Sequence, residues 1–165
     1  MASYQIRFGN LNDVDLITPL FDQYRQFYGE PPQPIPARAF LRDRLVQGES
    51  QIIVAESGPD IIGFTQLFPS FSSVTLQRLW VLNDLYVDAA HRGNGVGRAL
   101  LRAAAEFGRQ AGAKQLFIEG AVANKSARGL YEDFGFVKNS DYVYYHLPLT
   151  RPSYQSSHRT ESNHE

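Results

Sequence analysis

Apolar residues recur along the chain with two different periods, and these periods predict its strands and helices. Tyr4, Ile6 and Phe8 alternate with polar residues, which is the pattern of a strand with one buried face. Short apolar runs bounded by turn residues predict further strands, including a hairpin around residues 57–60. Strands are thus expected at residues 4–8, 51–56, 61–68, 79–87, 114–119, 136–137 and 141–149.

The clearest helix is predicted from Val96 to Ala111. Its apolar residues fall on one face, and its charged residues lie largely on the others. Gly112, directly after it, is a typical residue for ending a helix. Another helix is expected to start after Asn124, which suits an N-cap, and to end at Phe134 before a glycine.

Prolines shape the prediction for the N-terminal part. Asn12 or Asp13 can cap a helix with an apolar stripe, in which Pro19 is expected to cause a kink or a break. Four prolines within residues 29–36 predict an irregular segment, because proline fixes φ and lacks an N–H donor. A short helix follows and ends near Gly48. The order of helices and strands predicts an α+β, or mixed α/β, domain around one sheet.

Length and composition indicate one domain. The chain has 165 residues, of which 43% are hydrophobic, so it can bury a proper core. We expect the domain to occupy residues 1–149, because residues 150–165 lack apolar periodicity and are expected to form a disordered tail. No signal-peptide pattern is visible, and no apolar run approaches the roughly 18 residues of a membrane span. A cytoplasmic protein is therefore expected.

Charge and cysteine usage exclude several classes of function. Lys and Arg number 16 against 17 Asp and Glu, so the basic excess of a nucleic-acid binder is missing. No run of basic residues favours a membrane surface either, and we expect neither kind of partner. The chain has no cysteine, which excludes disulfides, cysteine-bearing metal sites and thiol-based covalent catalysis. No metal is expected.

Candidate chemistry begins with a glycine-rich turn. The strand that ends at Val87 is followed by residues 92–97, which read RGNGVG, and then by the start of a helix. A helix start exposes unpaired N–H groups and the positive end of the helix dipole, and glycines let an anion approach the backbone. Arg92 and Arg98 add positive charge. The turn therefore favours a phosphate or pyrophosphate site.

Three other interpretations of this turn compete with that one. A Walker loop requires Lys and then Ser or Thr after the last glycine, but Arg98 and Ala99 stand there. A dinucleotide-binding fingerprint needs G-x-G-x-x-G in an early βαβ unit, whereas these glycines fall at 93, 95 and 97 after antiparallel-looking strands. The last alternative is a tight turn without any ligand.

Two motifs resemble the signatures of the GNAT family of N-acetyltransferases. The first is RxxGxG, which begins at Arg92, and the second is NxxAxxxYxxxGF, which runs from Asn124 to Phe136. The order of elements extends the resemblance over residues 4–149. It implies a GNAT-like fold with a central mixed, largely antiparallel sheet flanked by about four helices. It also implies that an acetyl group moves from acetyl-CoA, as co-substrate, to a primary amine.

The same resemblance implies where acetyl-CoA binds. Main-chain groups of Leu85 and Val87 would pair with the pantetheine arm like another strand, and Asn124 would hydrogen-bond the same arm. Asn124 can also be a helix cap and nothing more. The amides from Gly93 to Arg98 would hold the pyrophosphate. The expected binding residues are Leu85, Tyr86, Val87, Arg92, Gly93, Asn94, Gly95, Val96, Gly97, Arg98 and Asn124.

The resemblance places Tyr131 as the general acid for the leaving sulfur, with a core aromatic residue as the alternative. Asp84 is a candidate base or amine anchor, because a carboxylate in an apolar strand is costly unless it is paired or functional. Glu119 is the rival, and a water chain to either carboxylate is a third choice. Asn83 stands where similar diamine acetyltransferases often have Glu. The resemblance therefore does not imply a catalytic base at position 83. Without cysteine, direct attack in a ternary complex is expected.

The acceptor is the least specified part of the prediction. Tyr24, Tyr28 and Glu119 are the candidate substrate-binding residues, because aromatic rings near carboxylates suit a cationic amine. Resemblance to a subgroup with fungal histone and polyamine acetyltransferases implies a small polyamine or an amino-acid amine. The alternatives are a lysine side chain of a protein or peptide, and a non-catalytic acyl-CoA-binding sensor. A homodimer is left open as the assembly.

Overall fold

Five strands of the chain form one sheet in a computed structural model that describes residues 3–120 and 123–149. The strands lie side by side in the order in which they occur in the sequence. Their bounds are β1 Gln5–Phe8, β2 Gln51–Ser57, β3 Asp60–Ser72, β4 Gln77–Val87 and β5 Gln115–Phe117. Neighbouring strands are antiparallel except β4 and β5, which run parallel.

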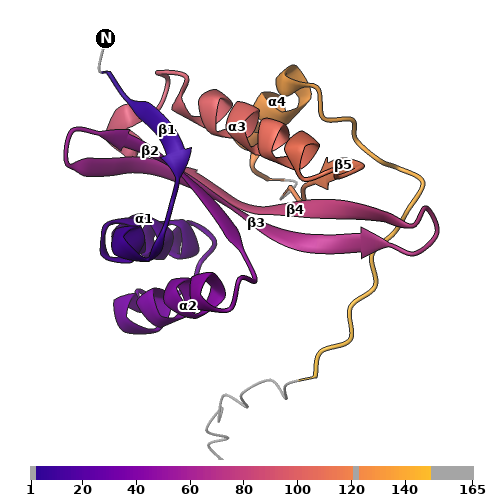
Figure 1. Cartoon of the computed structure of the whole chain (residues 1–165), viewed down its shortest axis with the longest axis horizontal. Coiled ribbons are helices and arrows are strands. Elements are labelled where there is room, and N and C mark those ends of the chain that lie inside the picture. The colour runs from indigo at the N-terminus through magenta and orange to yellow at the C-terminus, as the bar shows by residue number, and fades with distance from the viewer. Residues whose placement is uncertain (1–2, 121–122, 150–165) are drawn as a thin grey trace, which may run out of the picture.

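Four α-helices cover the two faces of this sheet (Figure 1). Helices α1 and α2 lie on one face, and α3 and α4 lie on the other. Their bounds are α1 Val14–Phe27, α2 Pro34–Val46, α3 Val96–Gln110 and α4 Lys125–Phe134, and short 3-10 helices occur at Leu11–Asp13 and Ala89–His91. The predicted α+β class, with a largely antiparallel sheet and about four helices, is confirmed.

Strand β2 shows how the sequence builds two cores on one sheet. Ile52 and Val54 pack in the core below α1 and α2, whereas Ile53 and Ala55 pack in the core below α3. Because successive strand residues point to opposite faces, a continuous apolar run is buried on both sides. None of the helices in residues 3–120 and 123–149 has the length and apolar character needed to span a membrane.

Prolines affect the helices less than the sequence predicts. Helix α1 continues through Pro19 without a break, and the hydroxyl of Thr18 donates to the Val14 carbonyl at 2.7 Å. Helix α2 already begins at Pro34, inside the segment expected to be irregular. Proline is tolerated in the first turn of a helix, because the N–H groups there have no intrahelical partner. Residues 29–33 of the segment are non-helical, and residues 34–36 belong to α2.

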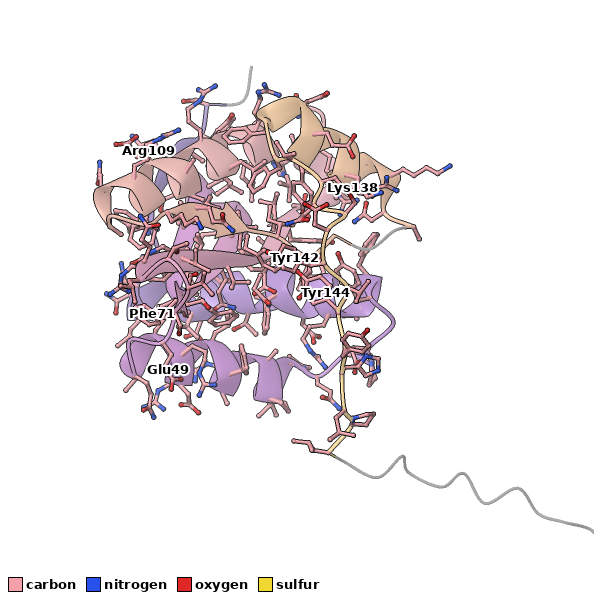
Figure 2. All side chains as sticks on the ribbon, turned by 90° about the vertical axis from the view of Figure 1, so that its right-hand side faces the viewer. Glu49, Phe71, Arg109, Lys138, Tyr142 and Tyr144 are labelled. Atoms are coloured by element: carbon pink, nitrogen blue, oxygen red, sulfur yellow. The ribbon has the colours of Figure 1, made fainter. Side chains whose placement is uncertain are left out.

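The prediction of two strands after α4, at residues 136–137 and 141–149, is wrong. Within the described residues, 136–149 form an extended segment that runs past the β3–β4 hairpin without joining the sheet (Figure 1). Tyr142 and Tyr144 project from this segment (Figure 2) and are exposed, although the Tyr144 ring lies 6.1 Å from that of Phe117 between centroids. An alternating pattern becomes a strand only where a neighbour supplies hydrogen bonds. The tail expected at 150–165 lies outside the described residues.

Candidate functional site

The loop between β4 and α3 takes its shape from local hydrogen bonds. The Asp88 carboxylate accepts from the Ala90 N–H at 3.0 Å and pairs with His91 Nδ1 at 2.9 Å. The contact with His91 holds the pKa of this carboxyl below its usual range. Gly93 and Gly95 then both adopt φ +78°, a left-handed conformation that residues with a side chain rarely adopt. The loop therefore requires glycine at these two positions.

The first turn of α3 offers hydrogen-bond donors beside this loop. Gly95 is the N-cap of α3 and makes no side-chain cap bond, so the first N–H groups of the helix lack an intrahelical partner. A Cβ atom at Gly93 would meet no other atom within 4 Å, so the backbone borders open space. Arg92 and Arg98 line the same space with two positive charges. These features fit a phosphate or pyrophosphate group.

The loop forms one wall of a cavity of about 490 Å³, here called the glycine-loop cleft. Strand β4 and helices α1, α3 and α4 supply the other walls. The volume lies in the range of small-molecule sites in proteins. The lining residues are Tyr24, Phe27, Tyr28, Leu85, Tyr86, Val87, His91, Arg92, Gly93, Gly95, Val96, Gly97, Arg98, Asn124, Ser126, Ala127, Leu130 and Tyr131.

Strand β4 leaves one edge open toward this cleft. Its parallel ladder with β5 ends at Val81 and Phe117, whereas its ladder with β3 continues to Val87. The last part of β4 therefore extends beyond the end of β5. The Val87 carbonyl accepts a hydrogen bond from Arg92 Nε at 2.9 Å. A ligand with amide groups can bind along such an edge in the way that an added strand does.

Helix α4 brings two predicted residues to the cleft. Asn124 is its N-cap and accepts from the Ala127 N–H at 3.1 Å through Oδ1, while the NH₂ group of the same amide is a donor. Tyr131 lies farther along the helix and is half-buried. Burial, and in second place the neighbouring Tyr28, raise the pKa of Tyr131 to about 12. Its phenol therefore carries its proton at neutral pH and can donate it.

Tyr24 of α1 and Tyr28, directly after this helix, both line the glycine-loop cleft and a second cavity of about 430 Å³, here called the aromatic cavity. The Tyr24 ring lies 5.1 Å from Tyr28 and 6.3 Å from Tyr86 between centroids. Burial, and then the charge of Asp84, raise the pKa of Tyr24. The residues lining the aromatic cavity are Phe21, Tyr24, Arg25, Tyr28, Glu30, Gln33, Pro36, Ala37, Phe40, Asn83 and Asp84.

A β-bulge sets the surroundings of Asp84. Gln66 lies opposite Asp84 and Leu67 lies opposite Leu82, so Asn83 is an extra residue in β4. Asp84 is only 3% exposed. Its Oδ2 accepts from Gln66 Nε2 at 2.6 Å, and its Oδ1 accepts from Asn83 Nδ2 at 3.0 Å. Two neutral amides thus hold the carboxyl group at the wall of the aromatic cavity.

Asp84 differs from the other buried carboxylates of the described residues, Asp13 and Asp22. Asp13 is bound by Arg7 at 2.8 Å, and Asp22 is bound by Arg25 at 2.7 Å. Asp84 has hydrogen bonds from amides instead, and the loss of hydration dominates and raises its pKa. Buried carboxylates with raised pKa values at a cavity wall are typical of proton-transfer sites.

Most predicted site residues line the two adjacent cavities, but two of them lie elsewhere. The Asn94 amide turns back and donates to the carbonyls of His91 and Arg92 at 3.3 and 3.4 Å, so it supports the loop itself. Glu119 is exposed and lines neither cavity. Asp84 lies in the aromatic cavity rather than in the glycine-loop cleft. The structure thus favours Asp84 over Glu119 as the carboxylate next to the site.

Some residues of the site have no clear signal in the sequence. His91 and Ser126 both line the cleft; His91 directly precedes the first motif, and Ser126 stands at an unspecified position of the second. Gln66 could not be found from a motif, because its contact with Asp84 depends on strand register and on the bulge. Within residues 3–120 and 123–149, no group of three or more His, Asp or Glu side chains is arranged to hold a metal ion.

Known proteins are similar to this chain in sequence. Residues 17–136 match the Acetyltransferase (GNAT) family. The chain is 44% identical over 142 residues to the uncharacterized N-acetyltransferase YhfO of Bacillus subtilis (strain 168). That alignment covers 86% of this chain and 95% of the relative. The similarity therefore extends over nearly the whole length of both proteins.

Solved structures are similar to this chain in fold. The crystal structure of a probable acetyltransferase has a TM-score of 0.84 and 37% sequence identity, covering 90% of this chain and 99% of that one. A ribosomal-protein-alanine N-acetyltransferase from Brucella melitensis has a TM-score of 0.75 and 21% identity, covering 90% of this chain and 100% of that one. The second likeness concerns the fold alone.

Proposed function

The chain belongs to the acetyltransferase (GNAT) family and is an acyltransferase, and from this we propose that it transfers acetyl from acetyl-CoA to a primary amine by direct attack in a ternary complex. The family uses acetyl-CoA as co-substrate. The observation that carries the proposal is that two cavities meet at Tyr24 and Tyr28, with Tyr131 lining one and Asp84 lining the other. The proposed transferase domain comprises residues 1–149. Since the chain has no cysteine, no thiol can carry the acetyl group.

The glycine-loop cleft is the proposed site for acetyl-CoA. The N–H groups of the first turn of α3, with Arg92 and Arg98, form a positive region for the diphosphate. The open edge of β4 at Leu85 and Val87 offers main-chain groups to the pantetheine amides. The NH₂ group of Asn124 is a further donor for the same arm. These roles are supported by position, since all of these residues line the cleft.

Tyr131 is the proposed general acid. Its pKa of about 12 keeps the phenol protonated at neutral pH, so it can donate to a sulfur that gains negative charge. As the bond between the acetyl carbon and sulfur breaks, the sulfur takes the phenolic proton and leaves as a thiol. The phenolate then regains a proton that comes from the acceptor nitrogen. Tyr131 is thereby ready for the next turnover.

Asp84 is the proposed base. A primary ammonium with a pKa near 10.4 is neutral in only about one in 2,500 molecules at pH 7, so a base is needed. Asp84 takes one proton from the ammonium, directly or through a water molecule, and frees the lone pair that attacks the acetyl carbon. The nitrogen loses a second proton, which replaces the one that Tyr131 gave to sulfur. Asp84 releases its proton to solvent, and the raised pKa of Asp84 makes it a stronger base than an exposed carboxylate.

The aromatic cavity is the proposed acceptor site. Phe21, Tyr24 and other rings form its walls, and Glu30 and Asp84 add negative charge. Arg25 also lines the cavity, where it is bound to Asp22 at 2.7 Å and lies 3.9 Å from the Glu30 carboxylate. Aromatic faces and carboxylates together suit an ammonium group on an apolar stem. We propose a small polyamine or an amino-acid amine as the acceptor, with a protein lysine side chain as the alternative.

The test is release of CoA thiol from acetyl-CoA with separate panels of polyamines, amino acids and lysine peptides. A thiol-detecting reagent meets no protein background, because the chain has no cysteine. Amine-dependent release, with the acetylated amine identified by mass spectrometry, is the expected result and identifies the acceptor class. Tight binding of acetyl-CoA without release in any panel would contradict the proposed acceptors and favour an acyl-CoA sensor.

A further inference from the structure

We propose that Gln66 is a positioning residue for Asp84, which holds the carboxyl group in one place in both its ionised and its protonated form. The inference rests on the proposed function, in which Asp84 takes up and releases a proton in every turnover. Gln66 lies in β3, is fully buried and pairs with Asp84 across the strands. A base that must return a proton to solvent needs support in both states.

Of the two polar atoms in the side-chain amide of Gln66, one makes a hydrogen bond within the described residues and the other does not. Its Nε2 donates to Asp84 Oδ2 at 2.6 Å, whereas its Oε1 is buried without a hydrogen-bond partner among the described residues. A buried oxygen without a donor costs stability, and an apolar side chain of similar size would avoid that cost. We therefore infer that Oε1 of Gln66 accepts a hydrogen bond from a donor that is present at another stage of the reaction.

Protonation of Asp84 supplies this donor. Rotation about the last torsion of Gln66 exchanges the places of Nε2 and Oε1 with little change in shape. With Asp84 ionised, Nε2 donates to Oδ2; with Asp84 protonated at Oδ2, the new O–H donates to Oε1. The other oxygen, Oδ1, already accepts from Asn83 Nδ2 at 3.0 Å, which leaves Oδ2 to take the proton.

The two amides make the strongest contacts with Asp84, ahead of the charged and titratable groups around it. From α1, the Tyr24 hydroxyl donates to the Asn83 carbonyl at 3.1 Å and also lies within reach of the Asp84 carboxyl, where it opposes the rise in the pKa of Asp84 less strongly than the two amides do. Arg25 and Glu30 share the aromatic cavity, where Arg25 is bound to Asp22 and lies 3.9 Å from Glu30. Of the two amides that contact Asp84, that of Gln66 makes the shorter hydrogen bond and comes from the neighbouring strand.

The experiment is an NMR titration of the Asp84 side-chain carboxyl in the full chain without substrate. Gln66→Met keeps the length of the side chain but loses both polar atoms. The variant loses the hydrogen bonds to both forms, and because the bond to the ionised form is charge-assisted and therefore stronger, the titration midpoint of Asp84 should rise by about one pH unit. Gln66→Glu should give a coupled titration in two steps, since two carboxyl groups then share one proton. Thermal unfolding confirms that each variant is folded.

The matched control is Thr18→Val, which removes a buried hydroxyl of α1 that donates to the Val14 carbonyl. It should leave the titration midpoint of Asp84 unchanged. Such a result shows that the loss of a buried hydrogen bond elsewhere does not by itself shift the midpoint. An unchanged midpoint in Gln66→Met together with a single-step titration in Gln66→Glu would overturn the proposal, whether or not the enzyme turns over any amine.

The pH dependence of kcat/KM separates this inference from the proposed function. If Asp84 is the base, the acid limb of the profile should move in Gln66→Met by the same amount as the NMR midpoint. A shifted midpoint with an unmoved acid limb would keep the link between Gln66 and Asp84 but would remove Asp84 as the base. Failure of all amines to be acetylated concerns the proposed function and leaves the titration result intact.

Discussion

The hydroxyl of Tyr24 donates a hydrogen bond of 3.1 Å to the backbone carbonyl of Asn83. This contact joins helix α1 to the bulged residue of β4, directly before Asp84. The Tyr24 ring lines both cavities, so the hydrogen bond fixes the wall across which acetyl donor and amine are proposed to meet. The bond therefore affects the relative placement of the two substrates more than the binding of either one.

Removal of this hydrogen bond should reduce turnover of the amine. In Tyr24→Phe the ring keeps its packing against Phe21 and Phe64, and only the hydroxyl is lost. A net hydrogen bond of about 1 kcal/mol corresponds to about a fivefold lower kcat/KM for the amine. Steady-state kinetics at saturating acetyl-CoA measures the effect. An unchanged kcat/KM for the amine would mean that the Tyr24 ring keeps its place between the two cavities without the hydrogen bond to Asn83.

A bulky residue at Gly95 should abolish binding of acetyl-CoA. Gly95 has φ +78°, so Gly95→Val strains the loop and turns the N–H groups of α3 away from their present direction. Isothermal titration calorimetry should show at least a hundredfold weaker affinity for acetyl-CoA, equivalent to about 3 kcal/mol. Wild-type affinity in this variant would remove the assignment of the diphosphate to this loop.

Gly129→Ala is the control for the Gly95 variant. Gly129 lies within α4, and a Cβ atom there meets no other atom within 4 Å. Alanine favours a helix over glycine by about 1 kcal/mol, so this variant should be at least as stable as the wild type. Its affinity for acetyl-CoA should be unchanged. The pair thus separates loop geometry from the general effect of replacing a glycine.

Replacement of Tyr131 by Phe should slow the transfer without weakening the binding of acetyl-CoA. The variant keeps the ring, which contacts Phe136 at 5.9 Å between centroids, and loses the proton donor. General acid catalysis commonly contributes about a hundredfold or more, so kcat should fall by at least that factor. Kinetics and calorimetry together check this split. Tyr145→Phe, at a tyrosine that is 92% exposed, is the control and should behave like the wild type.

Asp84→Asn should make the protein more stable at neutral pH while reducing its activity. Burial raises the folded-state pKa of Asp84 above its usual value, so the ionised group costs stability above that pKa. The cost amounts to about 1.4 kcal/mol for each unit of the rise; it begins to fall as the pH drops to the folded-state pKa and is gone below the unfolded-state pKa. Thermal unfolding should therefore show a higher Tm for the variant at neutral pH and a smaller difference in acid.

Asp13→Asn provides the opposite case for comparison. Its hydrogen bond with Arg7 holds the pKa of Asp13 below the usual value, so this carboxylate stabilises the fold above its unfolded-state pKa. That contribution is lost as the pH falls through the lower folded-state pKa. The variant should be less stable at neutral pH, in contrast to Asp84→Asn. A loss of stability in both variants would mean that the amides around Asp84 compensate for the burial of its charge.

The parts of the site that the sequence predicts are those that depend on local chemistry. The glycine loop, the start of α3 at Val96 and the Asn124 cap are set by residues within one or two turns, and the structure has all three. Helix α2 was missed at its start because Pro34 looks like a helix breaker, although a first-turn proline is compatible with a helix.

The parts that the sequence does not predict depend on distant segments. Gln66 and Asp84 are 18 residues apart, and their contact requires the β3–β4 register with its bulge. The aromatic cavity likewise needs α1 and α2 to pack against β4 before its walls exist. The pattern at 141–149 predicted a strand, but a strand also needs a neighbour, which alternation along one segment does not specify.

The most direct measurement follows a radioactive acetyl group from acetyl-CoA in the presence and absence of the best amine found in the panels. Direct transfer in a ternary complex predicts that the label appears in the amine in step with free CoA thiol. It also predicts that no label stays on the protein when the amine is left out. Stable label on the protein before amine is added, or release of free acetate alone, would contradict direct transfer to an amine.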